Sequence, residues 1–317
     1  MTATLAIIVV SYNTRERTLA CLRSALAEPA GVDTQLVLVD NDSADNSAEA
    51  VERQLPEVTV VRTGSNLGFA RAVNRGVASS DAEFVLLLNP DTIVLPGSLR
   101  ALLDFARENP RHGVYGGRTL REDGTLDPSS CWGAPSIWSL SMFALGLSTA
   151  FSGSRVFDPE SLGSWSRDSV REVPIVTGCL LLIPRKQFEA IGRMDERFFL
   201  YGEDAEFSLR AARHGLRPVI VPQAEIIHAV GASTGARGPK MNMVMAGKVT
   251  MLRASWSPSR AAAGVRLLLA GALLRSGLES ITRRRDRMWT HVWRSRQKWL
   301  PGYPVAERTL FGLEAAR

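Results

Sequence analysis

The sequence of 317 residues lacks three signals that would place it quickly in a class: paired cysteines, a signal peptide and a glycine-based phosphate motif. Its cysteines, Cys21, Cys131 and Cys179, are an odd number, lie far apart and form no CxxC pair. This argues against a disulfide framework or a structural zinc site and fits a reducing compartment. The N-terminus has neither the basic region nor the small-residue cleavage site of a signal peptide, so we interpret residues 5–10 as a strand.

The missing phosphate motifs narrow the ways in which the chain can bind a nucleotide. There is no G-x-G-x-x-G after the first strand and no G-x-x-x-x-G-K-[ST] anywhere. The usual glycine cradles for a dinucleotide or a triphosphate are therefore excluded. If the chain binds a diphosphate, a metal ion together with arginine is the obvious substitute.

The composition is that of a folded protein, and its charge is unevenly distributed. Hydrophobic residues make up 45%, enough for one large domain with or without an appendage. The net charge is +6, but residues 253–298 carry eleven Arg and Lys against two acids, a net +9, which leaves −3 for the remainder. A basic tail on a mildly acidic body indicates an anionic partner: a membrane surface, a nucleic acid or a phosphorylated substrate.

The first third of the sequence alternates strand-like and helix-like segments. Buried apolar runs predict strands, and segments with apolar residues at helical spacing follow them. This order predicts an α/β fold with a mostly parallel, Rossmann-like central sheet flanked by helices. The predicted strands are 5–10, 35–40, 58–62 and 83–88, and the predicted helices are 15–28, 44–55, 69–78 and 99–108.

Ligands of such sheets bind beyond the carboxyl ends of the strands, and unusual polar residues stand at these ends. They are Ser11-Tyr12-Asn13, Asp40-Asn41-Asp42 and Asn89-Pro90-Asp91.

The remainder of the chain is predicted as an acceptor-binding part and a helical tail. Residues 123–171, rich in Ser, Gly, Trp and Pro, are predicted loops that line an acceptor site. Regular structure follows at 173–183, 185–191, 203–214 and 217–221, and the pattern is helical from 240 to 296. We therefore predict a catalytic domain over 1–238, with a nucleotide-binding part near 1–120 and an acceptor part near 121–238, and a basic helical extension over 239–317.

Two strand ends carry carboxylates that suit nucleotide binding. Asn89 and Asp91 are two residues apart and point the same way, and a carboxylate there suits a hard divalent cation that also holds phosphate oxygens. The alternative is a turn in which Asp91 bonds its own backbone. Asp40 can accept a hydrogen bond from a base or a ribose hydroxyl, and the alternative is an Asx-turn before the next helix.

Three further places carry candidate functional residues. In the loop that begins at Asn66, Gly68 permits close backbone approach and Arg71 can contact the diphosphate; the alternative is that Arg71 lies on a solvated helix face. Glu203 and Asp204 start a helix below an aromatic cluster, where desolvation would suit a general base, although the helix dipole alone favours acids there. His228 after an apolar run is either a metal ligand or a packed histidine.

Seven stretches in this order resemble glycosyltransferase family 2, the inverting enzymes of the GT-A fold, and within it the bacterial rhamnosyltransferase-like branch. Together they cover most of residues 5–233. They are VVSYN (9–13), VDNDS (39–43), NLGFARAVNRG (66–76), LLLNPDT (86–92), VTGCLLLIPR (176–185), MDERFFLYGEDAEFSLRAARHG (194–215) and IIHAVGAST (226–234).

The resemblance implies a role for each of these places. Asp204, paired with Glu203, would be the catalytic base, and Asp91 and His228 would bind Mg²⁺ or Mn²⁺. The nucleotide side would comprise Ser11, Tyr12, Asn13, Asp40, Asn66, Gly68, Arg71 and Asn89, and the acceptor side Asp195, Tyr201 and Trp132. The chain departs from the family pattern twice, with Asn89 in place of the first acid of DxD and Glu206 in the fourth position of Glu-Asp-x-Asp.

The tail combines basic residues with tryptophan. Residues 261–274 are apolar except for Arg266 and are too short to span a bilayer. Arg283, Arg284, Arg285, Arg287, Arg294, Arg296 and Lys298 are interleaved with Trp289, Trp293 and Trp299. This pattern suits a helix in a membrane interface. Helices packed on the body or on a second subunit of a homodimer are the alternative, and with no nucleic-acid-binding fold in sight we predict no nucleic-acid partner.

These observations predict an inverting, metal-dependent hexosyltransferase at the cytoplasmic face of the cell membrane. It would transfer a sugar from a nucleotide diphosphate donor, with dTDP-L-rhamnose as the first candidate, to a hydroxyl of a glycan or of a polyprenyl-diphosphate-linked acceptor in cell-wall or surface-polysaccharide synthesis. Uridine-linked sugars use the same scaffold. The alternatives are a non-catalytic nucleotide-sugar-binding or scaffold protein of this fold and a nucleic-acid-associated protein.

Overall fold

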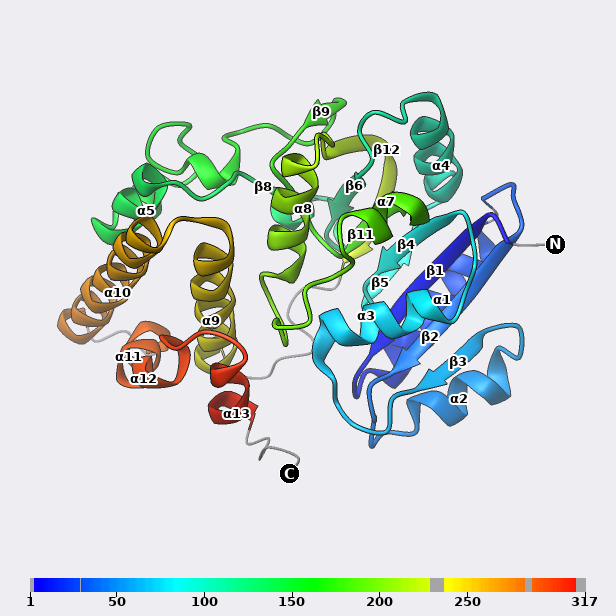
Figure 1. Ribbon diagram of the computed structural model, residues 1–317, viewed down its shortest axis with the longest axis horizontal. Helices are drawn as coiled ribbons and strands as arrows, with labels where there is room; N and C mark the ends of the chain where they lie inside the picture. Colours follow the sequence, from blue (N-terminus) through cyan, green and yellow to red (C-terminus); the bar gives the residue numbers. More distant parts are fainter. Residues whose placement is uncertain (1–2, 29, 229–236, 283–286, 312–317) are drawn as a thin grey trace. The chain divides into compact units, whose positions relative to one another are not determined.

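The computed structural model describes residues 3–28, 30–228, 237–282 and 287–311 (Figure 1). Part of the last matching stretch, 229–234, and the arginines 283–285 of the tail lie outside them. The chain forms two compact units. The first comprises Met1–Trp132, Ser166–Glu196 and Phe207–Ser233, and the second comprises Gly133–Trp165, Arg197–Glu206 and Thr234–Arg317. The predicted domain boundary at residue 238 stays a prediction.

The first unit is built on a sheet whose first half is parallel, as predicted. Its order begins β3-β2-β1-β4, and each neighbouring pair runs in the same direction. All seven residues of β1 are buried, because helices cover both faces of the sheet. These strands are β1 (Leu5–Ser11), β2 (Thr34–Asp40), β3 (Thr59–Arg62) and β4 (Phe84–Leu88).

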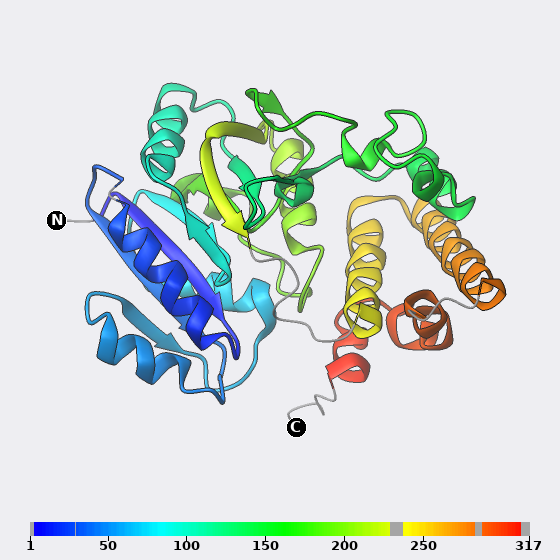
Figure 2. The same cartoon turned by 180° about the vertical axis from the view of Figure 1, so that it is seen from behind.

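Helices from the first third of the chain cover the two faces. Residues of α1, α2 and α4 join the core on the face that bears Ile7 and Val9. On the other face, a Cβ on Gly76 of α3 would lie 2.6 Å from Ile8 and from Val39, so that α3 sits directly on the strands. α3 lies in front of the sheet in Figure 1, and α1 lies in front of it in Figure 2, which views the protein from the opposite side. The helices are α1 (Arg15–Ala27), α2 (Ser47–Gln54), α3 (Gly68–Ala78) and α4 (Ser98–Glu108).

The second half of the sheet mixes directions. β11 lies antiparallel between β4 and β6, and β12 runs parallel to β6 and antiparallel to β5. The regular structure predicted over 173–183 consists of two strands, and the strand predicted at 217–221 continues to His228. The strands are β5 (Thr92–Val94), β6 (Tyr115–Leu120), β7 (Leu126–Asp127), β8 (Cys131–Trp132), β9 (Arg171–Glu172), β10 (Ile175–Val176), β11 (Leu180–Pro184) and β12 (Val219–His228).

Three more helical segments complete this part of the chain. α8 begins in the second unit, and its residues from Phe207 onward belong to the first. The segments are η1 (Pro128–Ser130), α7 (Arg185–Ala190) and α8 (Glu203–Arg213).

The second unit is helical. The loops predicted over 123–171 are wrong for 137–150, which form two helices. The first of them, α5, packs on α10. Ser136 and Ser139 form a capping box at the start of α5. The elements are α5 (Ile137–Ala144), α6 (Leu147–Ala150), η2 (Pro159–Ser161), α9 (Arg237–Ser255), α10 (Pro258–Ile281), α11 (Met288–Arg294), α12 (Arg296–Trp299) and α13 (Val305–Phe311).

The tail is helical as predicted, but two features of it differ from the prediction. The apolar segment belongs to a helix of 24 residues, α10, which is long and apolar enough to cross a membrane, as core helices of soluble proteins also can be; 39% of its most apolar stretch is buried. Trp299 does not face outward: it is fully buried, and its Nε1–H donates to the Val292 carbonyl at 2.9 Å.

Candidate active site

The carboxyl ends of β1 and β2 stand side by side and present an unsatisfied carboxylate oxygen. Ser11 and Asp40 are paired in the register of the two strands. Asp40 is 5% exposed, and its Oδ2 accepts the Ser43 N–H at 3.1 Å. Its Oδ1 has no hydrogen-bond partner among the described residues. Because buried oxygens are rarely left unpaired, Asp40 fits a ligand that brings a donor.

The three residues after β1 differ in what they offer. Ser11 is buried, and its hydroxyl bonds Thr14 and Thr18 at 3.0 and 2.9 Å, so it supports the loop from inside. Asn13 adopts a positive φ of 55°, and its Oδ1 accepts the Ala44 N–H at 2.8 Å, which ties this loop to the one after β2. Tyr12 is 47% exposed and offers its ring as a platform.

The loop from Asn66 to Gly68 is fastened to the end of β2 by an asparagine that the sequence reading did not single out. Asn41 is 3% exposed. Its Nδ2 donates to Asn66 Oδ1 and to the Gly68 carbonyl at 3.1 and 2.9 Å, and its Oδ1 accepts the Leu67 N–H at 3.0 Å. Gly68 has φ +77°, which favours glycine there. The signal was present in the stretch VDNDS, where Asn41 lies between two acids.

The helix that follows this loop holds the segment before the acidic pair. Arg71 Nε donates to the Glu196 carbonyl at 3.1 Å. Asn74, also missed by sequence reasoning, donates to the Met194 carbonyl and to Glu196 Oε1, both at 2.9 Å. Asp195 lies half-buried within this segment. The Arg71 side chain is therefore oriented by protein contacts, and its role toward a diphosphate stays a prediction.

The structure brings Asp91 and His228 together and adds a third residue. The antiparallel pairing of β5 with β12 sets His228 opposite Thr92, next to Asp91. His228 Nε2 lies 3.3 Å from Asp91 Oδ1, and its Nδ1 lies 3.4 Å from Asp127 Oδ2. All three side chains are nearly buried, with 9% of Asp91, 13% of His228 and 7% of Asp127 exposed. Asp127, at the end of β7, carried no signal beyond being an acid in a polar loop.

The two carboxylates dominate the electrostatics of this histidine. Burial lowers the pKa of His228, but the bonds to Asp127 and Asp91 outweigh burial and raise it to about 9. Burial raises the pKa of Asp127, and the bonds to His228 and Ser129 reverse this, so that the pKa falls below its ordinary value. Asn89 does not join this group: its Nδ2 donates to Cys179 Sγ at 3.3 Å.

The facing atoms Asp91 Oδ1 and His228 Nε2 are of the types that bind metal ions. Asp91 and His228 supply one carboxylate and one imidazole, a donor set that accepts a divalent cation when phosphate oxygens complete it. Among residues 3–28, 30–228, 237–282 and 287–311, no group of three His, Cys, Asp or Glu side chains forms a complete metal site. The residues present therefore fit a cation that arrives with, or is completed by, a phosphorylated ligand.

The predicted catalytic pair opens α8 in the second unit. Glu203 is 5% exposed, and its Oε2 has no partner within the described part of the chain. Burial, reinforced by the neighbouring Asp204 charge, raises the pKa of Glu203 to about 8. Asp204 is half-buried, and its Oδ1 accepts the Ala205 N–H at 2.7 Å. At neutral pH Glu203 is thus mainly a neutral acid.

Close backbone packing fixes the turn that precedes this pair. Tyr201 and Gly202 have positive φ values of 67° and 97°. A Cβ on Gly247 of α9 would lie only 1.9 Å from the Tyr201 carbonyl oxygen, so the turn rests directly on α9. The Tyr303 hydroxyl donates to the Leu200 carbonyl at 2.8 Å and supports the turn further.

The predicted acceptor residues are distributed over the two units. Trp132 ends β8 in the first unit and is 37% exposed, and Asp195 belongs to the same unit. Tyr201 belongs to the second unit, with Lys240 Nζ 5.8 Å from its ring centroid. The role of all three toward an acceptor stays a prediction.

Comparisons with known proteins agree with this reading of the fold. The family model "Glycosyl transferase family 2" matches residues 6–158, and "Glycosyl transferase family group 2" matches residues 84–305. The N-acetylglucosaminyl-diphospho-decaprenol L-rhamnosyltransferase of Mycobacterium tuberculosis is 34% identical over 274 residues, which is 80% of this chain and 84% of the relative.

Two solved structures share the fold at lower identity. The mannosyltransferase PcManGT from Pyrobaculum calidifontis, solved in complex with GDP-Man and Mn²⁺, superposes with a TM-score of 0.53 and 18% identity over 99% of this chain and 89% of its own. GalNAc-T7, solved with UDP, GalNAc and Mn²⁺, gives a TM-score of 0.60 and 15% identity over 96% of this chain and 58% of its own. Both are GT-A glycosyltransferases, so the predicted fold class is confirmed. With its motifs in order, the matching family models and a relative at 34% identity, this chain belongs to glycosyltransferase family 2, as a rhamnosyltransferase-like member.

Proposed function

We propose that this glycosyltransferase moves L-rhamnose from dTDP-L-rhamnose to a hydroxyl of a polyprenyl-diphosphate-linked acceptor, with inversion at the anomeric carbon. The observation that carries the proposal is the facing pair of Asp91 Oδ1 and His228 Nε2, 3.3 Å apart at the carboxyl edge of the sheet. This is where a GT-A fold receives the diphosphate of its donor. The alternative of a non-catalytic binding protein loses support because Asp91, His228 and Asp204 are all present.

The nucleoside would be recognised at the ends of β1 and β2. The unpaired Oδ1 of Asp40 would accept a hydrogen bond from the base or the ribose, and the exposed ring of Tyr12 would stack on the base. The loop that Asn41 fastens at Asn66 and Gly68 would let the donor approach the backbone closely at Gly68, which has no side chain.

Asp91 and His228 would hold the divalent cation. When bound, such a cation neutralises the charge that develops on the leaving nucleoside diphosphate. The imidazole nitrogen among the ligands favours Mn²⁺ over Mg²⁺, which binds oxygen almost exclusively. Asp127 would accept the Nδ1 proton of His228 and so keep Nε2 turned toward the cation, as carboxylates behind metal-bound histidines do.

Asp204 would be the general base. It would take the proton of the acceptor hydroxyl while the acceptor oxygen forms a bond to the anomeric carbon and the bond from that carbon to the diphosphate oxygen breaks. Glu203 beside it is buried and mainly protonated at neutral pH, so it adds no second negative charge that would compete for the proton. The half-buried position of Asp204 supports this division of roles.

The choice of donor and acceptor rests on the relative from Mycobacterium tuberculosis. Its name specifies L-rhamnose as the transferred sugar and a decaprenol diphosphate carrying N-acetylglucosamine as the acceptor. An identity of 34% over four fifths of this chain supports the same classes of donor and acceptor here. We therefore place the reaction at the inner face of the cell membrane, where such a lipid presents its head group to cytoplasmic enzymes.

The test is release of free nucleoside diphosphate by the purified protein with Mn²⁺ or Mg²⁺, a panel of nucleotide sugars and a lipid extract that contains the acceptor. We expect metal-dependent release from dTDP-L-rhamnose, lost in Asp204→Asn and in Asp91→Asn and kept in the exposed control Asp81→Asn. Release that ignores the metal, or that survives in Asp204→Asn, would contradict the assignment. Turnover of a uridine-linked sugar instead would keep the fold and the site but replace the donor.

A further inference from the structure

In the C-terminal half of α10, large apolar side chains face solvent and charged side chains are buried. Its large apolar residues are exposed: 50% of Leu273, 37% of Leu274, 50% of Leu278 and 79% of Ile281. At about 100° per residue these four lie within an arc of about 140° on the helix. The same arc carries no charged residue between Arg266 and the end of the helix at Ile281.

The two charged residues of this half-helix point the other way and are buried. Arg275 is 7% exposed and donates to the Phe143 carbonyl and to Thr149 Oγ1 at 2.6 and 2.8 Å. Glu279 is 8% exposed and accepts the N–H groups of Trp289 and Thr290 at 3.0 and 2.8 Å. The helix has charged side chains that could cover its outer surface, but they are buried. The exposure of the leucines therefore does not follow from a uniformly apolar composition.

The apolar arc continues onto the neighbouring turn. Leu145, after α5, is 64% exposed. A Cβ on Gly146, the next residue, would lie 3.3 Å from Leu274 Cδ2, so this turn adjoins α10. We call Leu145, Leu273, Leu274, Leu278 and Ile281 the apolar face. Five large apolar side chains gathered on one surface mark an interaction site rather than ordinary scatter.

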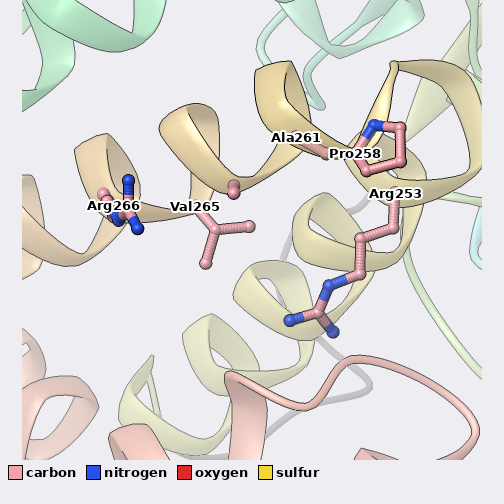
Figure 3. Close-up of a pocket in the computed structure, with 6 residues that line it drawn as sticks. Arg253, Pro258, Ala261, Val265 and Arg266 are labelled. Atoms are coloured by element: carbon pink, nitrogen blue, oxygen red, sulfur yellow. The ribbon is translucent and has the colours of Figure 1, made fainter.

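Exposed basic residues precede this face on α10 and follow α10 in the sequence. Arg266 precedes it on α10 and, together with Arg253, lines a hollow between α9 and the start of α10 (Figure 3). Beyond the other end of α10, Arg287, Arg294 and Lys298 are exposed. An apolar face accompanied in the same unit by exposed arginine and lysine complements a bilayer with anionic head groups, whereas a protein partner would need acids to match these charges.

We propose that the apolar face lies on an anionic phospholipid membrane and inserts its leucines into the boundary between head groups and acyl chains. The membrane contact rests on the proposed function and extends it, because an enzyme reaches an acceptor with a polyprenyl tail only at a membrane. The proposal assigns this contact to the aliphatic side chains and not to the tail tryptophans, because Trp299 is buried, Trp289 lies against Arg275 and Trp293 lies against Arg296.

The same contacts decide between lying on the membrane and crossing it. α10 meets the length and hydropathy of a spanning helix. To cross, it would have to leave α5, α9 and α11, breaking the bonds of Arg275 and Glu279 and carrying both charges into hydrocarbon. Lying in the interface keeps these bonds and buries the outer leucines, so the helix is expected to stay within its unit.

The experiment is sedimentation of the full chain with vesicles that contain no acceptor and no nucleotide sugar. We expect binding to vesicles of phosphatidylglycerol mixed with phosphatidylcholine, weaker binding to phosphatidylcholine alone, and weakening of the former in high salt. The double variant Leu274→Glu/Leu278→Glu should lower the partition coefficient by roughly tenfold or more. The matched control Val305→Glu, at a 54% exposed position of α13, should leave it unchanged.

Three outcomes would overturn the proposal. One is the absence of binding to either vesicle, and another is binding that the double variant does not reduce. The third is a dimer in light scattering that the double variant dissociates while vesicle binding persists, which would make a second copy of the chain the occupant of the apolar face. Because no sugar is transferred in this assay, its failure is distinct from a failure of the transferase proposal, which nucleoside diphosphate release tests separately. Circular dichroism confirms that the variants fold.

Discussion

His228 lies between two carboxylates that differ in what they can do for a metal ion. Asp91 faces Nε2 and can share a cation with it, whereas Asp127 faces Nδ1 and can only orient the ring. The sequence suggested Asp91 and His228 separately, each with a plain alternative as a turn residue or a packed histidine. The tertiary structure places them 3.3 Å apart, because β5 and β12 pair antiparallel although more than a hundred residues separate them.

We expect Asp127→Asn to weaken Mn²⁺ binding by about 10- to 100-fold while the fold is retained. The amide still fits the space, but it lacks the negative charge that makes the bonded imidazole a better ligand. Calorimetric titration of Mn²⁺ into the protein with thymidine diphosphate measures this directly. Glu122→Gln, an exposed acid in the preceding turn, is the control that should leave the affinity unchanged. Equal affinities for Asp127→Asn and the native chain would remove Asp127 from this role.

Glu203 should make the protein less stable as the pH rises. Its pKa is about 8 in the folded chain and near the ordinary 4.5 in the unfolded chain, so unfolding releases a proton between these values. Its favourable contribution is full below pH 4.5 and is lost as the pH rises through 8, a change on the order of a few kcal/mol.

Denaturant unfolding at pH 5.5 and pH 8.5 compares the native chain with Glu203→Gln, which keeps the shape and cannot ionise. We expect the native chain to lose more free energy of unfolding than the variant over this interval. A variant with the same pH dependence as the native chain would show that Glu203 is ionised in the folded protein.

At the scale of elements, the sequence patterns predicted the strands that continuous apolar runs encode and missed a helix whose stability depends on packing. The runs in β1 and β4 are apolar at every position because both sheet faces are covered, and they were recognised as strands. α5 was missed because its eight residues, IWSLSMFA, are stable as a helix only against α10. α2 begins at Ser47 rather than 44, because the residues before it are held in a loop: the Ser43 hydroxyl accepts the Asn13 N–H, and Asp45 Oδ1 accepts the Ser47 N–H at 3.1 Å.

We expect Gly247 and Gly277 to respond in opposite ways to substitution by alanine, because only Gly247 lies at the contact between α9 and the turn before α8. Gly247→Ala would drive a Cβ to within 1.9 Å of the Tyr201 carbonyl oxygen, so either the turn or the helix must move. We expect a loss of about 1–3 kcal/mol or more in unfolding free energy and a fall in nucleoside diphosphate release, because the moved turn carries Glu203 and Asp204.

Gly277→Ala on α10 is the matched substitution, because among the described residues no atom beyond the helix's own backbone and the neighbouring residues lies within 4 Å of the added Cβ. It should raise the unfolding free energy by about 0.5–1 kcal/mol through helix propensity alone. Urea denaturation of both variants gives the comparison. Equal effects of the two substitutions would show that the close approach at Gly247 does not determine the position of the turn.

At the scale of the whole molecule, the three cysteines report on global unfolding. Cys21, Cys131 and Cys179 are all buried thiols outside any disulfide, and burial raises the pKa of the Cys21 thiol to about 12 and that of Cys131 above its ordinary value. The thiolate is the reactive form, so the native chain should react slowly with a disulfide reagent, and all three thiols should react in denaturant. Rapid reaction of one thiol in the native chain would reveal a local opening well below the global unfolding free energy.

The sequence by itself determined the order of strands and helices in the first third, the polar residues at the strand ends and the family. These features follow from apolar periodicity and from short motifs, which neighbouring residues encode. Tertiary structure alone decided which of these residues meet. Asn41 clasps the loop at Asn66, Asp127 stands behind His228, and Glu203 is buried beside the half-buried Asp204. It also turned α10 so that leucines face out and Arg275 and Glu279 face in. The direction in which a side chain points depends on the partners that the fold brings to it, and no local pattern carries that information.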